Sequence, residues 1–246
     1  MTTANVPVIS YYDADNLTLK LAVCNDTICS NPTIRPIDTI GNAGMSGSLA
    51  LSTANIPVIS YSDGTNGNLK MAVCNDAACT IANISTLDSS GDVFSGTSIA
   101  LGSTNCPVIS YFDQTYGNLK LVVFKNSDCS LMEISTLDSS EYVGYQNSLA
   151  LSSTNTPVIS YFDSTNTSLK LAVCNDAACS VPVISTLDSD GTVGTASSLA
   201  LTSANIPVIS YHDATNQDLK VVVCHDTACT NRIILNLDSS GNVGGE

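Results

Sequence analysis

Short apolar runs of four to seven residues recur along the whole chain, separated by clusters of Gly, Asn, Asp and Ser. In one stretch these runs lie at 48–52, 57–62, 69–74 and 84–88, and residues 63–68 have the composition of a turn. Runs of this length, bounded by turn residues, are typical of strands rather than helices. The pattern therefore predicts an all-β chain in which the second and third runs form a hairpin.

This pattern repeats with a period of 50 residues. The block Asn-Val-Pro-Val-Ile-Ser-Tyr, which begins at Asn5, returns at 55, 105, 155 and 205 with one variable position and without insertion or deletion. Five periods of 50 need 250 positions and the chain has 246, so four positions are missing between Glu246 and Met1. The five repeats therefore form either a closed ring, in which the chain starts and ends at one point, or a stretch of a longer array of repeats. The repeats span approximately 1–46, 47–96, 97–146, 147–196 and 197–246.

Five equal units of four strands, with apolar residues on both faces of the middle strands, predict sheets that cover one another. We expect a single domain, 1–246, folded as a five-bladed β-propeller with four antiparallel strands per blade. A solenoid would need atypical capping repeats, which the sequence lacks. The strand at 48–52 has only four copies, so either the first blade lacks this strand or residues 1–4 supply a shortened one.

Charge and hydropathy exclude several classes of partner. The chain carries 8 Lys and Arg against 22 Asp and Glu, a net charge of −14. Nucleic acids and anionic membrane surfaces are recognised by clustered basic residues, so neither is an expected partner. No apolar run approaches the roughly 18 residues of a spanning helix, and we expect no membrane insertion.

The ten cysteines carry the strongest chemical signal. Four repeats have two Cys separated by four residues, whereas the third has Phe124 at the first position and an additional Cys106. A hairpin register with Val108 opposite Phe124 brings Cys106 to the end of the blade where Cys129 lies. We predict one disulfide per blade, with the pairs Cys24–Cys29, Cys74–Cys79, Cys106–Cys129, Cys174–Cys179 and Cys224–Cys229.

Metal binding is the rival interpretation of these cysteines, but two per blade fall short of the four ligands of structural zinc. Paired cysteines indicate an oxidising compartment, so the expected location is secreted, extracellular or at the cell surface. Residues 1–5 lack the pattern of a signal peptide, and we expect a mature segment or a recombinant excision from a longer protein. N-glycosylation sequons, which a secreted protein can use, begin at Asn16, Asn25, Asn83 and Asn166.

The repeat reads SLAL, PVISYYD, LKLAVC and ISTLDSSG in succession, with small variations. It resembles a repeat found in many secreted bacterial β-propeller proteins, and the resemblance covers almost the whole chain. In blade number and repeat length the chain is also similar to the tachylectin-type five-bladed lectins, although a chain without Trp lacks their Trp-Asp signature. The Asp-box of sialidases, which ends in Thr-Trp, is likewise absent. The resemblance implies the architecture and no particular ligand.

Ten aspartates recur with the repeat and are expected at one end of the propeller. They could hold calcium or another ligand, because calcium favours clustered carboxylate oxygens. Ordinary turn chemistry, in which the carboxylate bonds backbone N–H groups, is the alternative. One set lies at the ends of the second strands and consists of candidate ligand-binding residues: Asp13, Asp63, Asp113, Asp163 and Asp213. The other set lies at the ends of the fourth strands and consists of weak candidates for metal ligands: Asp38, Asp88, Asp138, Asp188 and Asp238.

Five lysines also recur, and we expect their side chains to run along the blade and meet the repeated carboxylates. The predicted hairpin register, with Tyr111 opposite Leu121, places each lysine opposite the variable position after the repeated tyrosine. These residues are Lys20, Lys70, Lys120, Lys170 and Lys220.

The third repeat departs most from the pattern. Tyr116, Tyr142 and Tyr145 fall at the end that carries the aspartates, where aromatic rings suit stacking on a sugar or peptide. Gln146 is off pattern as well. Drift of one redundant repeat explains the same departures, so both interpretations stay open.

Catalysis needs residues with different roles, and near-identical repeats offer no asymmetric carboxylate pair. We therefore expect a non-enzymatic binding module, lectin-like, that recognises carbohydrate or protein through repeated sites. The first alternative is a structural or self-assembling surface or fibre protein, and the second is a propeller glycosidase. The expected partners are a glycan, a surface protein or a second copy. No cofactor is expected, calcium excepted.

Overall fold

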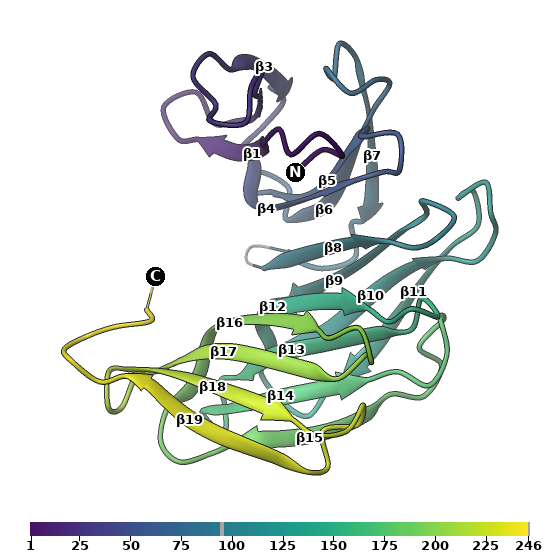
Figure 1. Cartoon of the computed structure of the whole chain (residues 1–246). Helices are drawn as coiled ribbons and strands as arrows, with labels where there is room; N and C mark the ends of the chain where they lie inside the picture. The colour runs from purple at the N-terminus through teal and green to yellow at the C-terminus, as the bar shows by residue number, and fades with distance from the viewer. Residues whose placement is uncertain (94–95, 246) are drawn as a thin grey trace.

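The computed structural model describes residues 1–93 and 96–245, and every regular element in these ranges is a β-strand. The strands form five antiparallel sheets in chain order, the first of three strands and the others of four. Figure 1 shows the sheets arranged side by side around a centre, as the blades of a β-propeller. No helix among the described residues is long and apolar enough to cross a bilayer. The fold is thus all-β with repeated blades, as predicted.

Each sheet is built from consecutive strands. The first sheet contains β1 (Val8–Asp13), β2 (Thr18–Val23) and β3 (Thr33–Asp38). The second contains β4 (Ala43–Leu51), β5 (Pro57–Asp63), β6 (Asn68–Cys74) and β7 (Ala82–Asp88), and the third β8 (Thr97–Leu101), β9 (Pro107–Asp113), β10 (Asn118–Phe124) and β11 (Met132–Asp138). The fourth contains β12 (Val143–Leu151), β13 (Pro157–Asp163), β14 (Ser168–Val173) and β15 (Val183–Asp188), and the fifth β16 (Val193–Leu201), β17 (Pro207–Asp213), β18 (Asp218–Cys224) and β19 (Arg232–Asp238).

The innermost strands β4, β8, β12 and β16 contact one another in succession. Three of them begin earlier than predicted, as β4 does at Ala43 rather than at residue 48. The part of β4 that lies before the predicted strand begins next to Gly44, whose φ of +104° is a left-handed value. A Cβ on Gly44 would lie 2.7 Å from Cα of Leu19 in the preceding sheet. Glycine here permits close contact between sheets, a requirement that strand propensity does not reveal.

The hairpin register differs by one residue from the predicted one. Tyr111 lies opposite Lys120, not Leu121, and Val108 lies opposite Val123 rather than Phe124. The physical cause is the turn, because the N–H groups of Thr115 and Tyr116 both bond to Oδ1 of Asp113 and close a four-residue loop. The lysine and tyrosine of each repeat are consequently direct cross-strand neighbours.

The core lies between the sheets. Every residue of β5, β9 and β13 is buried, which requires cover on both faces of the sheet. The buried apolar residues form clusters that each join two successive sheets, such as the one uniting Leu119 and Leu121 with Ile159 and Tyr161. Burial of these branched and aromatic side chains is the main stabilising contribution to such a fold.

The arc of sheets is open between the first and the fifth, as Figure 1 shows. Ile9 of the first sheet is 49% exposed, whereas its equivalent Ile59 is fully buried. At the other side of the opening Leu237 is 57% exposed, against 3% for its equivalent Leu187. The apolar residues on both sides of the opening therefore remain uncovered.

All ten cysteines are paired, one disulfide in each sheet, as predicted. The pair Cys106–Cys129 replaces the local bridge that Phe124 removes from the third repeat. The prediction succeeds despite the register error, because a shift of one residue still leaves both cysteines at the same end of the blade.

Candidate functional site

Three innermost strands, β4, β12 and β16, carry a bulge at one equivalent position. In β12, Tyr145 pairs with Phe162 and Ser148 with Ser160, so Gln146 and Asn147 together oppose one residue. The first bulged residue has a left-handed φ in each of them, namely Ser46 (+50°), Gln146 (+48°) and Ala196 (+49°), and Gly96, at the equivalent position before β8, has a φ of +76°. Left-handed backbone at a non-glycine residue is uncommon, and bulges of this kind are enriched next to functional sites.

These bulges surround a cavity of about 420 Å³. No side chain among its described lining residues is charged, although the chain as a whole carries −14. The lining combines hydroxyls, two side-chain amides and one aromatic ring. The residues are Ser46, Gly47, Gly96, Thr97, Tyr145, Gln146, Asn147, Ala196 and Ser197.

Hydrogen bonds between successive sheets hold the cavity walls. Oγ1 of Thr97 donates to the carbonyl of Ser46 over 2.9 Å, and Nδ2 of Asn147 donates to the carbonyl of Gly96 over 2.8 Å. The N–H of Ala196 donates to Oε1 of Gln146 over 2.8 Å. Because each of these four segments is hydrogen-bonded to the next, the cavity is preformed rather than assembled on binding.

The three predicted tyrosines occupy different places. Tyr145 lines the cavity, and its ring contacts that of Phe112 edge-on at 6.0 Å between centroids. Tyr142 is 41% exposed and contacts the same Phe112 ring at 5.0 Å. Tyr116 is 63% exposed on the preceding hairpin turn and does not line this cavity. Phe112 therefore joins Tyr142 and Tyr145 into one aromatic cluster at the cavity edge.

A second cavity of about 340 Å³ adjoins the first, since Gln146 and Ala196 line both. It lies beside the C-terminal segment and includes His212, whose Nδ1 is 3.2 Å from Oγ1 of Thr195. Nε2 of His212 is buried without a hydrogen-bond partner. Gln146 and Ala196 therefore form a wall that the two cavities share.

The aspartates at the ends of the second strands close the hairpin turns. Oδ1 of Asp63 accepts the N–H of Thr65 at 3.1 Å, and Oδ2 accepts the amide of Asn66 at 3.0 Å. Asp163 and Asp213 make the same contacts with their own turns. In the second to fifth sheets these carboxylates are at most 3% exposed. These aspartates therefore stabilise the hairpin turns by accepting hydrogen bonds from turn residues.

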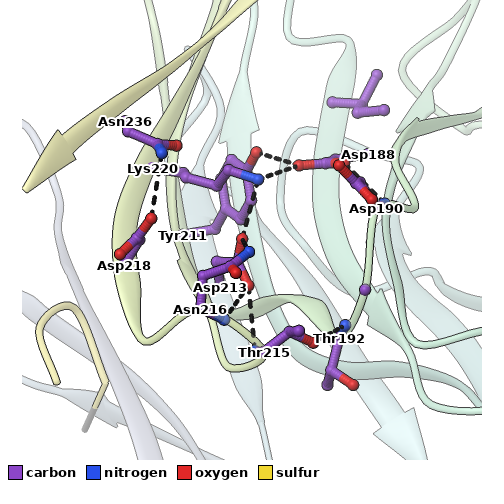
Figure 2. A network of polar contacts seen from close by, with 12 residues as sticks. Asp188, Asp190, Thr192, Tyr211, Asp213, Thr215, Asn216, Asp218, Lys220 and Asn236 are labelled. Atoms are coloured by element: carbon purple, nitrogen blue, oxygen red, sulfur yellow. Dashed lines mark hydrogen bonds and ion pairs between the residues drawn. The ribbon is translucent and has the colours of Figure 1, made fainter. Parts of the chain in front are cut away.

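The aspartates at the ends of the fourth strands connect each sheet to the next. Figure 2 shows the arrangement between the fourth and fifth sheets, where Tyr211 and Lys220 both point toward Asp188. Oδ2 of Asp188 accepts the phenol of Tyr211 at 2.6 Å and lies 3.3 Å from Nζ of Lys220. The same lysine is 3.0 Å from Oδ2 of Asp213. The lysines thus meet the repeated carboxylates, as predicted.

Three earlier boundaries carry equivalent contacts, made by Asp38, Asp88 and Asp138. Burial opposes ionisation of Asp138, but hydrogen bonds from Lys170, Ser140 and Tyr161 outweigh it and lower its pKa to about 2. Burial together with the adjacent carboxylate raises the pKa of Tyr161 far above its usual range. Each buried lysine and tyrosine therefore faces an ionised aspartate.

Across residues 1–93 and 96–245, no three His, Cys, Asp or Glu side chains are grouped to hold a metal ion. Both sets of aspartates lie apart from the lining of the central cavity. The sequon asparagines Asn16, Asn25, Asn83 and Asn166 are all exposed. Asn16 and Asn166 use their amides to bond the turn aspartates Asp13 and Asp163.

Sequence reasoning reached Tyr145 and Gln146 through their departure from the repeat, but it missed the bulges. A usable signal exists in hindsight. Positions 46, 96, 146 and 196 hold Ser, Gly, Gln and Ala, whereas residues two places later are Ser in all four copies. Positions whose residue type differs between repeats, within a segment that is otherwise the same in every repeat, are therefore the ones that line the cavity.

No family model matches this chain, and no curated protein sequence matches it. Solved structures match in fold. A protein of unknown function from Dyadobacter fermentans has a TM-score of 0.61 at 10% identity, over 98% of this chain and 85% of that one. An Aleuria aurantia lectin in complex with Fucα1-6GlcNAc has a TM-score of 0.56 at 11% identity, over 95% and 79%.

An α-L-arabinofuranosidase from Fusarium graminearum, in complex with an iminosugar inhibitor, has a TM-score of 0.61 at 12% identity, over 89% of this chain and 74% of that one. At these identities the likeness is one of fold alone. The chain accordingly has a β-propeller-type fold shared by a lectin and a glycosidase.

Proposed function

We propose that this protein is a non-enzymatic carbohydrate-binding module that acts in an extracellular or cell-surface compartment, and that the central cavity receives a neutral sugar. The observation that carries the proposal is the uncharged lining of the cavity in a strongly acidic chain. Sugar rings present hydroxyls on their edges and C–H groups on their faces. The hydroxyl and amide side chains of the cavity suit hydrogen bonds to the sugar hydroxyls, and the Tyr145 ring suits stacking on the C–H face.

Binding rather than hydrolysis is favoured by the same lining. Glycoside hydrolysis uses two carboxyl groups that flank the scissile bond, roughly 5 to 9.5 Å apart. The described residues of the cavity include neither Asp nor Glu. Repeated aspartates such as Asp63 and Asp188 are already engaged, the first in its turn and the second in a contact between sheets.

The disulfide-bonded cysteines support the proposed extracellular or cell-surface location. Five disulfides in one chain of this size are typical of an oxidising environment. The likeness in fold to a fucose-containing lectin complex and to an arabinofuranosidase supports a carbohydrate ligand at the level of the fold. The proposal places one site at the cavity rather than one in each repeat, because among the described lining residues the aromatic side chain comes from Tyr145 of the third repeat.

The test is a glycan array followed by calorimetric titration of the best sugar, with and without calcium. Tyr145→Ala should weaken binding by about tenfold or more, whereas Tyr145→Phe should retain most of the affinity, because stacking needs the ring and not the hydroxyl. Tyr116→Ala is the matched control, since Tyr116 is exposed and lies outside the cavity. A silent array, or equal losses in Tyr145→Ala and Tyr116→Ala, would contradict the proposal.

A further inference from the structure

The aromatic cluster at the cavity edge extends beyond the cavity itself. Tyr145 is among the residues that line the cavity, whereas Tyr142 is not. Both rings contact the buried ring of Phe112, at 6.0 Å from Tyr145 and 5.0 Å from Tyr142 between centroids. The two tyrosine centroids are therefore at most about 11 Å apart, the sum of these two distances. A ligand confined to the cavity meets Tyr145 alone, and a short chain of sugars that begins there can reach Tyr142.

Tyr142 is held rigidly between two sheets. Its N–H donates to Oγ1 of Thr165 over 3.1 Å, and its carbonyl accepts the N–H of Ser164 over 2.9 Å. Both partners belong to the turn between β13 and β14 of the fourth sheet. On the other side, the ring lies against the β9–β10 turn of the third sheet, because a Cβ on Gly117 would be 2.9 Å from Cδ2 of Tyr142.

The Tyr142 ring is nonetheless 41% exposed. An aromatic ring that is already fixed in place loses little conformational freedom when a ligand stacks on it. Such a ring next to a cavity therefore serves as a preformed surface for the apolar face of a sugar.

The fold does not require an aromatic residue at this position. The other four repeats have polar residues there, namely Asn42, Asp92, Thr192 and Asn242. The same loop thus forms without a ring in every other repeat. The exposed ring of Tyr142 occurs in the one repeat that also places Tyr145 in the cavity.

We propose that the binding site continues from the cavity onto the exposed ring of Tyr142, and that its ligand is a linear neutral oligosaccharide rather than a single sugar. One sugar unit lies in the cavity beside Tyr145, and a following unit stacks on Tyr142. This inference rests on the proposed carbohydrate-binding function. Glu141, which is exposed next to Tyr142, disfavours an acidic sugar at the second position.

The test measures affinity as a function of chain length. The probes are linear β-1,4-linked series of glucose, mannose and N-acetylglucosamine, each from one to four units, titrated calorimetrically with the intact protein. In the series that binds best, Kd should fall by about three- to tenfold between the monosaccharide and the trisaccharide, because stacking on Tyr142 is added. A fourth unit should change Kd by less than about twofold.

Three variants locate the additional contact. Tyr142→Ala should remove most of the gain with chain length and leave the monosaccharide Kd within about twofold of that of the parent protein. Tyr142→Phe should keep the gain, because stacking uses the ring. Tyr116→Ala is the matched control, since Tyr116 is an exposed tyrosine outside the cavity, and it should also keep the gain.

A second measurement needs no variant. Tetranitromethane nitrates exposed tyrosine rings, and mass spectrometry of peptides identifies the modified residues. The trisaccharide should protect Tyr142 from nitration, and the monosaccharide should leave it reactive. Tyr116, which is 63% exposed, should react equally in both cases.

The outcomes separate this inference from the proposed function. Equal affinity for monosaccharide and trisaccharide, an unchanged gain in Tyr142→Ala, or nitration of Tyr142 in the presence of trisaccharide would overturn the extension onto Tyr142 and leave sugar binding in the cavity standing. A weaker monosaccharide affinity in Tyr142→Ala would also overturn it, because Tyr142 would then act by positioning Tyr145 through Phe112. A silent glycan array would overturn the proposed function and this inference together.

Discussion

Tyr61 donates a hydrogen bond of 2.7 Å to Oδ2 of Asp38, which lies in the preceding sheet. Lys70 reaches the same oxygen at 2.7 Å. The contact recurs at each boundary between successive sheets and has no counterpart across the opening of the arc, where Asp238 is exposed and Lys20 pairs with Asp13 of its own sheet. The repeat therefore carries identical residues in two different environments, which provides matched controls within one molecule.

The first prediction compares two equivalent tyrosines. Tyr161→Phe should lower the free energy of unfolding by about 1 to 2 kcal/mol, because it removes a buried hydrogen bond to an ionised Asp138. Tyr11→Phe should change it by less than about 0.5 kcal/mol, since Tyr11 is 37% exposed beside the opening. Urea unfolding measures both. Equal losses would indicate that the first and fifth sheets are in contact in solution.

The second prediction concerns acid. Asp88 and Asp138 have a pKa of about 2 in the folded chain, below the ordinary value of 3.8, because hydrogen bonds and lysines outweigh burial. A lowered carboxyl pKa contributes stability that is complete above about pH 5 and is lost as the pH falls toward 2. The melting temperature should be flat above about pH 5 and should fall steeply between pH 4 and 2.

Asp138→Asn should remove part of that acid dependence, whereas Asp92→Asn, at an exposed loop carboxylate, should leave the slope unchanged. A pH profile that is identical in the Asp138→Asn protein and the parent would contradict the assignment of the low pKa to this buried contact.

The third prediction distinguishes the two kinds of disulfide. Cys106–Cys129 closes a separation of 23 residues, whereas Cys174–Cys179 closes 5. Loss of loop-closure entropy in the unfolded chain makes the longer bridge more stabilising by about 1 kcal/mol. Replacing both cysteines of each pair by Ala, and comparing unfolding in urea, should show the larger loss for Cys106 and Cys129. The reverse order would mean that native packing around the short bridges dominates.

The fourth prediction concerns the glycines that let the sheets approach. Gly144 has φ of +105°, and a Cβ there would lie 2.8 Å from Cα of Leu119. Gly144→Ala should cost about 3 kcal/mol, from left-handed strain and a clash with backbone together. Gly241→Ala is the control, because Gly241 has φ of +110° but nothing within 4 Å of the added Cβ. It should cost about 1 kcal/mol. Equal effects would contradict close packing against Leu119 as the cause of the larger loss at Gly144.

Part of the candidate site could be found from the sequence. Tyr145 and Gln146 interrupt a repeat that is otherwise regular, and both line the cavity. Tyr116 interrupts it equally and lies outside, because departure from a repeat shows that a position is free to vary without showing where the position points. The aspartates were open to two interpretations, and the hydrogen bonds within the turns show how the structure employs them.

The sequence by itself determined the period, the approximate strand positions and the disulfide pairs, because most of these features depend on local chemistry that recurs in every repeat. Asp63 closes its turn with residues two and three places away, and four of the bridges span 5 residues. Tertiary structure alone decided which residues meet between sheets. Tyr61 and Asp38 are 23 residues apart, Lys70 and Asp38 are 32 apart, and the segments that line the cavity recur 50 residues apart. Such contacts depend on how one twisted sheet lies on the next, which no local pattern specifies.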